Sequence, residues 1–118
     1  MTTDKDREGR CYELAAKFVC RPQEDAILIH GTAEIGVGGK RIKHAWVISD
    51  AGYIWEPVSD RWFEPDVFEK RFKPVVEHQY GRTEAFLLSC KNYGPWTDAE
   101  RRRLRSPETV ALLKRLEV

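Results

Sequence analysis

The sequence is poor in cysteine. Its 118 residues include three cysteines, at positions 11, 20 and 90, and a small, odd number without close spacing does not indicate a disulfide framework. Cys11 and Cys20 fall in one predicted helix, about 13 Å apart, which is too far for a bridge. A bridge between Cys11 and Cys90 remains geometrically open, although such bonds are rare in the cytosol.

Long apolar runs are also missing. No apolar stretch approaches the roughly 20 residues that cross a bilayer. Residues 1–10 are polar and charged, without the apolar centre of a signal peptide. We therefore expect a cytoplasmic protein that does not enter a membrane.

The chain has no large excess of charge of either sign. It contains 20 Lys and Arg against 19 Asp and Glu, a formal net charge of +1, which gives no reason to expect a nucleic-acid or membrane-surface partner. Residues 101–105 form a basic run, but Asp98, Glu100 and Glu108 dilute it, so we interpret it as a solvated helix face. Phosphate binding by this run is a minor hypothesis that predicts salt-dependent binding to nucleic acid.

Metal-ligand spacing is absent from the sequence. Cys11, His30 and His44 could in principle meet at a zinc ion, but none of the close pair spacings typical of zinc sites is present. We predict neither a metal nor an organic cofactor.

Length and apolar spacing predict a single domain over residues 1–118. The predicted class is α+β: a helix that begins at Cys11 packs on a small antiparallel sheet, with further helices toward the C-terminus. We expect a flexible tail at 1–8, a catalytic-like core at 9–96 and C-terminal helices at 97–118. The other predicted elements are a strand from Ala26, a hairpin over 41–58, an extended segment at 75–80, and helices at 64–72, at 83–92, after Thr97 and after Ser106.

Side-chain placement can be predicted for two of these helices. In the helix at 64–72, Val67, Phe68 and Phe72 are expected to face inward. In the helix at 83–92, Thr83 is the predicted cap, and the inward residues are expected to be Ala85, Phe86, Leu88 and Cys90.

The hairpin over 41–58 brings a histidine and a carboxylate together. Gly52 suits the left-handed position of a three-residue loop, and this loop sets the register of the two strands. In that register Trp46 faces Glu56. His44 and Glu56 are then diagonal neighbours on one face, within side-chain reach of each other.

Cys11 supplies the nucleophile that this histidine–carboxylate pair lacks. A thiolate at a helix N-terminus is stabilised by unpaired backbone N–H groups and the helix dipole, and Arg10 would add positive charge beside it. His44 can take or share the thiol proton, and Glu56 can orient the imidazole. The backbone N–H of Cys11 would face a developing oxyanion.

The remaining candidate residues concern substrate binding. Arg10, Trp46, Trp55 and Tyr80 are the predicted substrate-binding residues. Trp46 and Trp55 could wall the site or fill the core, and Tyr80 or Gln79 could be a second oxyanion donor.

Each triad residue also has a plain structural interpretation. Cys11 could be an ordinary core residue, and His44 could bind a backbone carbonyl. Glu56 could be a surface strand residue. Asp60 is a rival acid and His30 a rival base.

The motifs resemble the transglutaminase-like branch of the papain-like cysteine hydrolases, including small members of bacterial or phage type. Members of that family have a cysteine that opens a helix, a strand with His-Ala-Trp-Val, and a later strand that ends in acid-Pro. Here these motifs are Cys11, residues 44–47 and residues 56–57. The similarity covers about residues 9–60, roughly half of the chain.

The resemblance implies a papain-like or transglutaminase-like core with Cys11 as nucleophile, His44 as base and Glu56 as third member. Two positions depart from the family pattern: Glu56 stands where Asp is usual, and Ile48 stands where Glu is frequent. The implied activity is thiol hydrolysis or acyl transfer at an amide bond, as in peptidases, amidases, deamidases and transglutaminases.

We therefore predict a cysteine-dependent hydrolase or acyltransferase with a protein or peptide substrate and a thioester intermediate. The alternative is a catalytically inactive protein-binding module, an inhibitor or adaptor on the same fold. That alternative predicts a deeply buried Cys11 with no cleft and no contact to His44. The sequence does not predict the oligomeric state.

Overall fold

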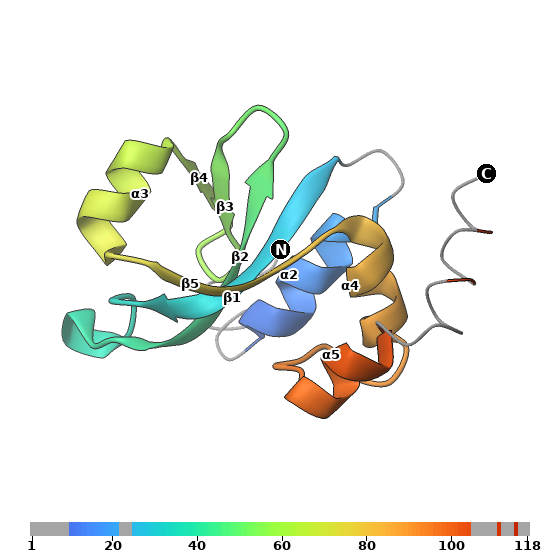
Figure 1. The fold of residues 1–118 in the computed structure, drawn as a ribbon. Helices are drawn as coiled ribbons and strands as arrows, with labels where there is room; N and C mark the ends of the chain where they lie inside the picture. The colour runs from blue at the N-terminus through green and yellow to red at the C-terminus, as the bar shows by residue number, and fades with distance from the viewer. Residues whose placement is uncertain (1–9, 22–24, 105–110, 112–114, 116–118) are drawn as a thin grey trace.

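The computed structural model describes residues 10–21, 25–104, 111 and 115. The predictions for residues 1–8 and for most of the chain after Ser106 lie outside this part. The helices and strands follow one another in the order α2 (Cys11–Val19), β1 (Ala26–Ala33), η1 (Val37–Gly39), β2 (Ile42–Ser49), β3 (Ile54–Glu56), β4 (Arg61–Phe63), α3 (Pro65–Phe72), β5 (Val75–Tyr80), α4 (Arg82–Ser89) and α5 (Asp98–Leu104) (Figure 1).

The five strands form one sheet in the order β4-β3-β2-β1-β5, and every neighbouring pair is antiparallel. The predicted α+β class is confirmed at this level. The pairing of β1 with β5 shifts between His30 and Gly31. A side chain at Gly31 would place its Cβ 2.0 Å from the carbonyl oxygen of Val75, so the close approach of β5 requires glycine there.

Alternate strand residues pack on opposite faces of the sheet, as the period of two requires. Leu28, Val47 and Trp55 join the core cluster that includes residues of α2 and α4. Trp46 and Ile54 join a second cluster around Phe68 of α3. Accordingly, α3 lies on the opposite side of the sheet from α2 and α4 (Figure 1).

The predicted register of the hairpin is confirmed. Val47 pairs with Trp55, and the backbone N–H of Ser49 donates to the carbonyl of Tyr53 at 2.9 Å. Gly52 has a φ of 91°, the left-handed conformation that the turn needs. The second strand is shorter than predicted, because β3 ends at Glu56 and a turn leads into β4, a strand that the sequence did not predict.

The start of α4 corrects the prediction for residues 83–92. The helix begins at Arg82 with Gly81 as N-cap, because the carboxylate of Glu84 accepts the backbone N–H of Gly81 at 3.4 Å. Phe86 is then 56% exposed and Cys90 is exposed, whereas both were expected to face inward.

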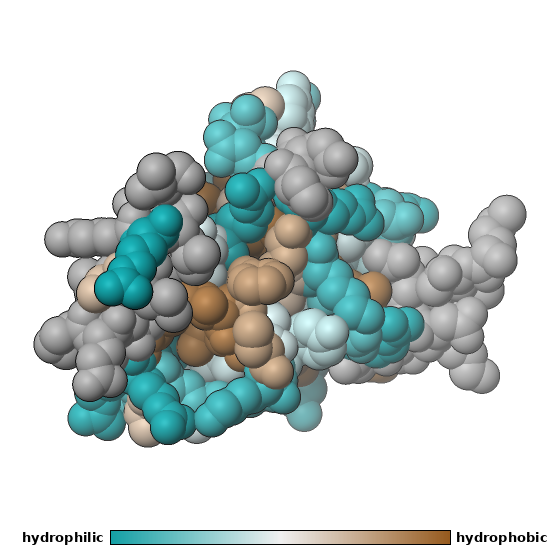
Figure 2. Space-filling model, turned by 90° about the vertical axis from the view of Figure 1, so that its right-hand side faces the viewer, coloured by the Kyte–Doolittle hydropathy of each residue, from teal (hydrophilic) through white to brown (hydrophobic). Residues whose placement is uncertain are grey.

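On the molecular face seen in Figure 2, apolar side chains reach the surface between hydrophilic ones.

The other two helices after the hairpin agree more closely with prediction. α3 has Pro65 in its first turn and buries Phe68, although Val67 is 48% exposed instead of inward-facing. α5 opens with the predicted capping box: Thr97 Oγ1 accepts the N–H of Glu100 at 3.2 Å, and Glu100 Oε1 accepts the N–H of Thr97 at 3.0 Å. Among the helices described, none is long and apolar enough to cross a bilayer.

Candidate active site

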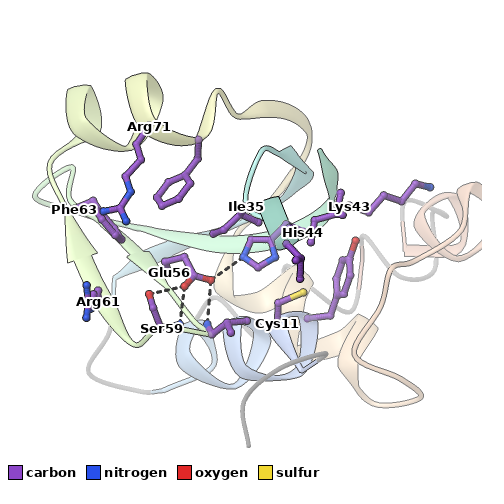
Figure 3. Close-up of a pocket in the computed structure, with 15 residues that line it drawn as sticks. Cys11, Ile35, Lys43, His44, Glu56, Ser59, Arg61, Phe63 and Arg71 are labelled. Atoms are coloured by element: carbon purple, nitrogen blue, oxygen red, sulfur yellow. Dashed lines mark hydrogen bonds and ion pairs between the residues drawn. The ribbon is translucent and has the colours of Figure 1, made fainter. Parts of the chain in front are cut away.

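Cys11, His44 and Glu56 line one pocket with a volume of about 670 Å³. They come from three elements: the first residue of α2, the third residue of β2 and the last residue of β3. Cys11 packs with the core on the α2 side of the sheet, whereas Ile35 and Phe72 of the pocket pack with the core on the α3 side. The pocket therefore connects the two layers where α2 begins near the start of β2 (Figure 3).

Cys11 is the first residue of a nine-residue helix and is 8% exposed. The N-cap residue, Arg10, makes no side-chain hydrogen bond to the helix end, so the backbone N–H groups of the first turn lack a helical acceptor. The guanidinium of Arg10 instead binds Glu13 at 3.1 Å. The carboxylate of Glu13 thereby offsets the positive charge that Arg10 was expected to place beside Cys11. The positive potential at Cys11 comes instead from the N-terminal end of α2.

His44 and Glu56 form a buried pair. Nε2 of His44 lies 2.8 Å from Oε1 of Glu56, and the two residues are 3% and 2% exposed. With Nε2 engaged, Nδ1 is the ring nitrogen left for Cys11. The sulfur of Cys11 points toward the imidazole (Figure 3).

Hydrogen bonds on both oxygens keep the buried carboxylate of Glu56 ionised. Oε1 also accepts the backbone N–H of Val58 at 3.0 Å, and Oε2 accepts the N–H and the hydroxyl of Ser59 at 2.7 and 2.6 Å. Burial opposes ionisation, but the bonds from His44, Ser59 and Val58 outweigh it and lower the pKa of Glu56 to about 2. The carboxylate is therefore a fixed negative charge behind the imidazole.

His44 is held in its protonated form. Burial favours the neutral ring, but side-chain hydrogen bonds with Cys11 and Glu56 outweigh burial and raise the pKa of His44 to about 9. An imidazolium at neutral pH, between a carboxylate and a sulfur, is the partner that stabilises a thiolate.

The four predicted substrate-binding residues are not among those that line this pocket. Trp46 is 1% exposed and packs on Phe68, and Trp55 stacks on Phe18 with ring centroids 4.6 Å apart. Tyr80 is buried, and Arg10 is exposed and bound to Glu13. The two tryptophans therefore occupy core positions. Gln79, which was considered with Tyr80 as a second oxyanion donor, is exposed on β5.

The rival acid and base are engaged elsewhere. Asp60 accepts the indole N–H of Trp55 at 2.9 Å. His30 stacks on Trp96, and its Nε2 has no hydrogen-bond partner among the described residues. Burial, with the charges of His78 and Arg101, lowers the pKa of His30 to about 4, so this ring is neutral at physiological pH.

No group of three metal-ligating side chains occurs in the part of the chain that the structure describes. The zinc site considered from the sequence would have required His30, whose ring contacts are aromatic. Tyr12 meets it edge-on with centroids 4.7 Å apart.

Sequence reasoning missed two residues that complete the site. Ser59 donates hydrogen bonds to the carboxylate of Glu56. A turn directly after Glu56 could have indicated this contact from the sequence, because the backbone N–H groups of a turn can reach a preceding carboxylate. Tyr12 lines the pocket beside Cys11. Burial and, to a smaller degree, the negative potential of Cys11 and Glu77 raise the pKa of Tyr12 to about 12, so its hydroxyl remains a neutral hydrogen-bond donor.

Comparisons with protein families, curated proteins and solved structures give no match for this chain. The resemblance to papain-like hydrolases therefore rests on the motifs alone. A functional conclusion has to come from the geometry of Cys11, His44 and Glu56 and from the pocket around them.

Proposed function

We propose that this protein is a cysteine-dependent hydrolase or acyltransferase that acts on amide bonds through a papain-like, transglutaminase-like arrangement. The observation that carries the proposal is the order of groups in the pocket: sulfur, imidazolium and ionised carboxylate. Each has the protonation state or the neighbour that its role requires.

The first half-reaction forms a thioester. The sulfur of Cys11, as thiolate, attacks the carbonyl carbon of the amide, and the carbonyl oxygen becomes an oxyanion. The backbone N–H groups at the start of α2 stabilise that oxyanion. When the carbon–nitrogen bond breaks, Nδ1 of His44 gives its proton to the leaving amine, which departs neutral.

The second half-reaction resolves the thioester. Neutral His44 takes a proton from water, or from an acceptor amine, as that group attacks the thioester carbonyl. The carbon–sulfur bond breaks, and the thiolate–imidazolium pair is restored. Glu56 keeps its charge throughout, because its hydrogen bonds to Ser59 and Val58 remain in place.

The geometry favours this function over an inactive binding module. The inactive module predicts a deeply buried Cys11 with no cleft and no contact to His44. Cys11 is buried, at 8% exposure, but it lines a pocket. Here a pocket includes both side chains, and the sulfur of Cys11 points toward the imidazole of His44 (Figure 3). A protein or peptide substrate and a cytoplasmic setting remain part of the proposal on the sequence grounds given above.

A reactive ester tests thioester formation without knowledge of the substrate. We expect p-nitrophenyl acetate to release nitrophenolate in a burst and to leave an acetyl group on Cys11, read by peptide mass spectrometry. His44→Ala should slow acylation by about a hundredfold, since proton transfer by a positioned base typically contributes that much or more. Cys90→Ala, which removes an exposed thiol, is the matched control and should change neither reading.

Two results would contradict the proposal. One is acetylation spread equally over the three cysteines. The other is acetylation of Cys11 at the same rate with and without His44, because the imidazole would then have no part in the chemistry.

A further inference from the structure

The end of the pocket opposite Cys11 carries two arginines. Arg71 extends from α3 toward Phe63, and Arg61 stands on β4 at the same end (Figure 3). Neither takes part in the ion pairs found among the described residues. Both residues are exposed.

Among the described residues that line the pocket, no carboxylate is left to pair with these arginines. Among the described residues that line it, Glu56 is the sole acid, and its two oxygens are occupied by His44, Val58 and Ser59. Apart from the two arginines and the imidazolium of His44, which pairs with Glu56, the lining has one more cation, Lys43, which points away from Cys11 and Glu56 (Figure 3). The positive charge at the arginine end is therefore not neutralised by the pocket itself.

Aromatic rings restrain one of the two guanidinium groups. The Cζ atom of Arg71 lies 5.1 Å from the ring centre of Phe72 and 5.9 Å from that of Phe63. Such stacking orients a guanidinium while leaving its in-plane N–H donors free for a carboxylate. Phe63, Phe72 and Ile35 also give this end of the pocket a partly buried apolar wall.

We infer that the substrate is an amide that carries a carboxylate beside an apolar group, and that Arg61 and Arg71 bind this carboxylate. The apolar group packs on the wall formed by Phe63 and Phe72. The inference rests on the proposed function, because it names the substrate class of the same pocket.

Two matched thiol reagents separate the charge of the ligand from its shape. N-iodoacetyl-phenylalanine has an apolar ring and a carboxylate, and N-iodoacetyl-phenylalanine amide differs from it only by a neutral carboxamide. We expect the acid to alkylate Cys11 roughly threefold to tenfold more efficiently than the amide, the range for partly exposed to well-formed arginine–carboxylate contacts. The preference should shrink as salt is raised.

Substitutions then assign the preference to its residues. Arg61→Gln combined with Arg71→Gln should abolish the preference, so that the acid and the neutral reagent alkylate Cys11 of the double variant at similar rates. Lys70→Gln, on the same helix but outside the pocket lining, is the matched control and should keep the preference.

The outcomes distinguish this inference from the proposed function. Equal, rapid reaction of both reagents with Cys11 overturns the inference and leaves the thiol chemistry intact. A preference that survives the double substitution also overturns it, since His44 would then be the anion site. If neither reagent modifies Cys11 faster than the exposed Cys90, the proposed function fails, and the inference fails with it.

Discussion

Glu56 stays charged inside the protein because the turn that follows it supplies hydrogen-bond donors. Two backbone N–H groups and one hydroxyl converge on its carboxylate in addition to His44. Glutamate is one methylene longer than the aspartate usual at the corresponding position of the family it resembles. The contacts to Val58 and Ser59 hold this longer side chain in place.

Glu56→Gln tests the role of this charge at the residue scale. The amide loses the negative charge and presents an NH₂ group where Ser59 needs an acceptor. We expect the pKa of His44 to fall from about 9, and the free energy of unfolding to fall by about 1–3 kcal/mol because a buried donor loses its partner. NMR titration of the imidazole and urea denaturation give the two values.

Glu69→Gln makes the same chemical change at an exposed position of α3 and serves as the control for that experiment. An unchanged titration of His44 in the Glu56 variant would show that the carboxylate does not set the protonation state of the ring.

At the scale of elements, local signals predicted much of what positions the site. The helix that opens at Cys11 was predictable from its apolar stripe. The hairpin was predictable because Gly52 and the loop length fix which residues of β2 and β3 pair. The contact between His44 and Glu56 follows from that register.

Other features depend on long-range packing and were not predictable in this way. β4 is three residues long, and it exists because it pairs with β3 along residues 54–56. The arginine end of the pocket needs α3 on the face opposite α2, and no local pattern fixes that placement. The tryptophans were ambiguous because an apolar strand face can line a site or fill a core, and here both are buried.

At the scale of the whole molecule, two buried histidines set opposite pH limits on stability. In the folded protein the pKa of His30 is about 4, below its ordinary value of 6.5, and that of His44 is about 9, above the same value. Below pH 6.5 His30 is protonated in the unfolded chain but stays neutral in the folded protein. The free energy of unfolding therefore falls as the pH drops toward 4. The protonated ring of His44 makes its full contribution to the free energy of unfolding below pH 6.5. That contribution is lost as the pH rises from 6.5 through 9.

We therefore expect the free energy of unfolding to have its maximum near pH 6.5, with a loss on the order of 3 kcal/mol at most on either side. Glu56 adds to the acid loss only below its ordinary pKa of 4.5, as the pH falls toward 2. Urea denaturation across this range measures the profile. His30→Phe retains a ring against Trp96 and should flatten the acid side above pH 4.5. His78→Gln removes only a neighbouring charge that helps to lower the pKa of His30, so it should reduce the acid loss much less than His30→Phe does. A profile that His30→Phe does not alter would contradict this assignment.

The central claim is that His44 activates Cys11, and the rate of alkylation by iodoacetamide measures it most directly. Mass spectrometry reads Cys11 and the exposed Cys90 in the same sample, at about pH 6.5, where an ordinary thiol is mostly protonated. Burial alone would make Cys11, at 8% exposure, the slower of the two. We predict that Cys11 reacts several-fold faster than Cys90 and that His44→Ala reverses this order. A Cys11 that reacts more slowly than Cys90, at a rate that His44→Ala leaves unchanged, would contradict the account.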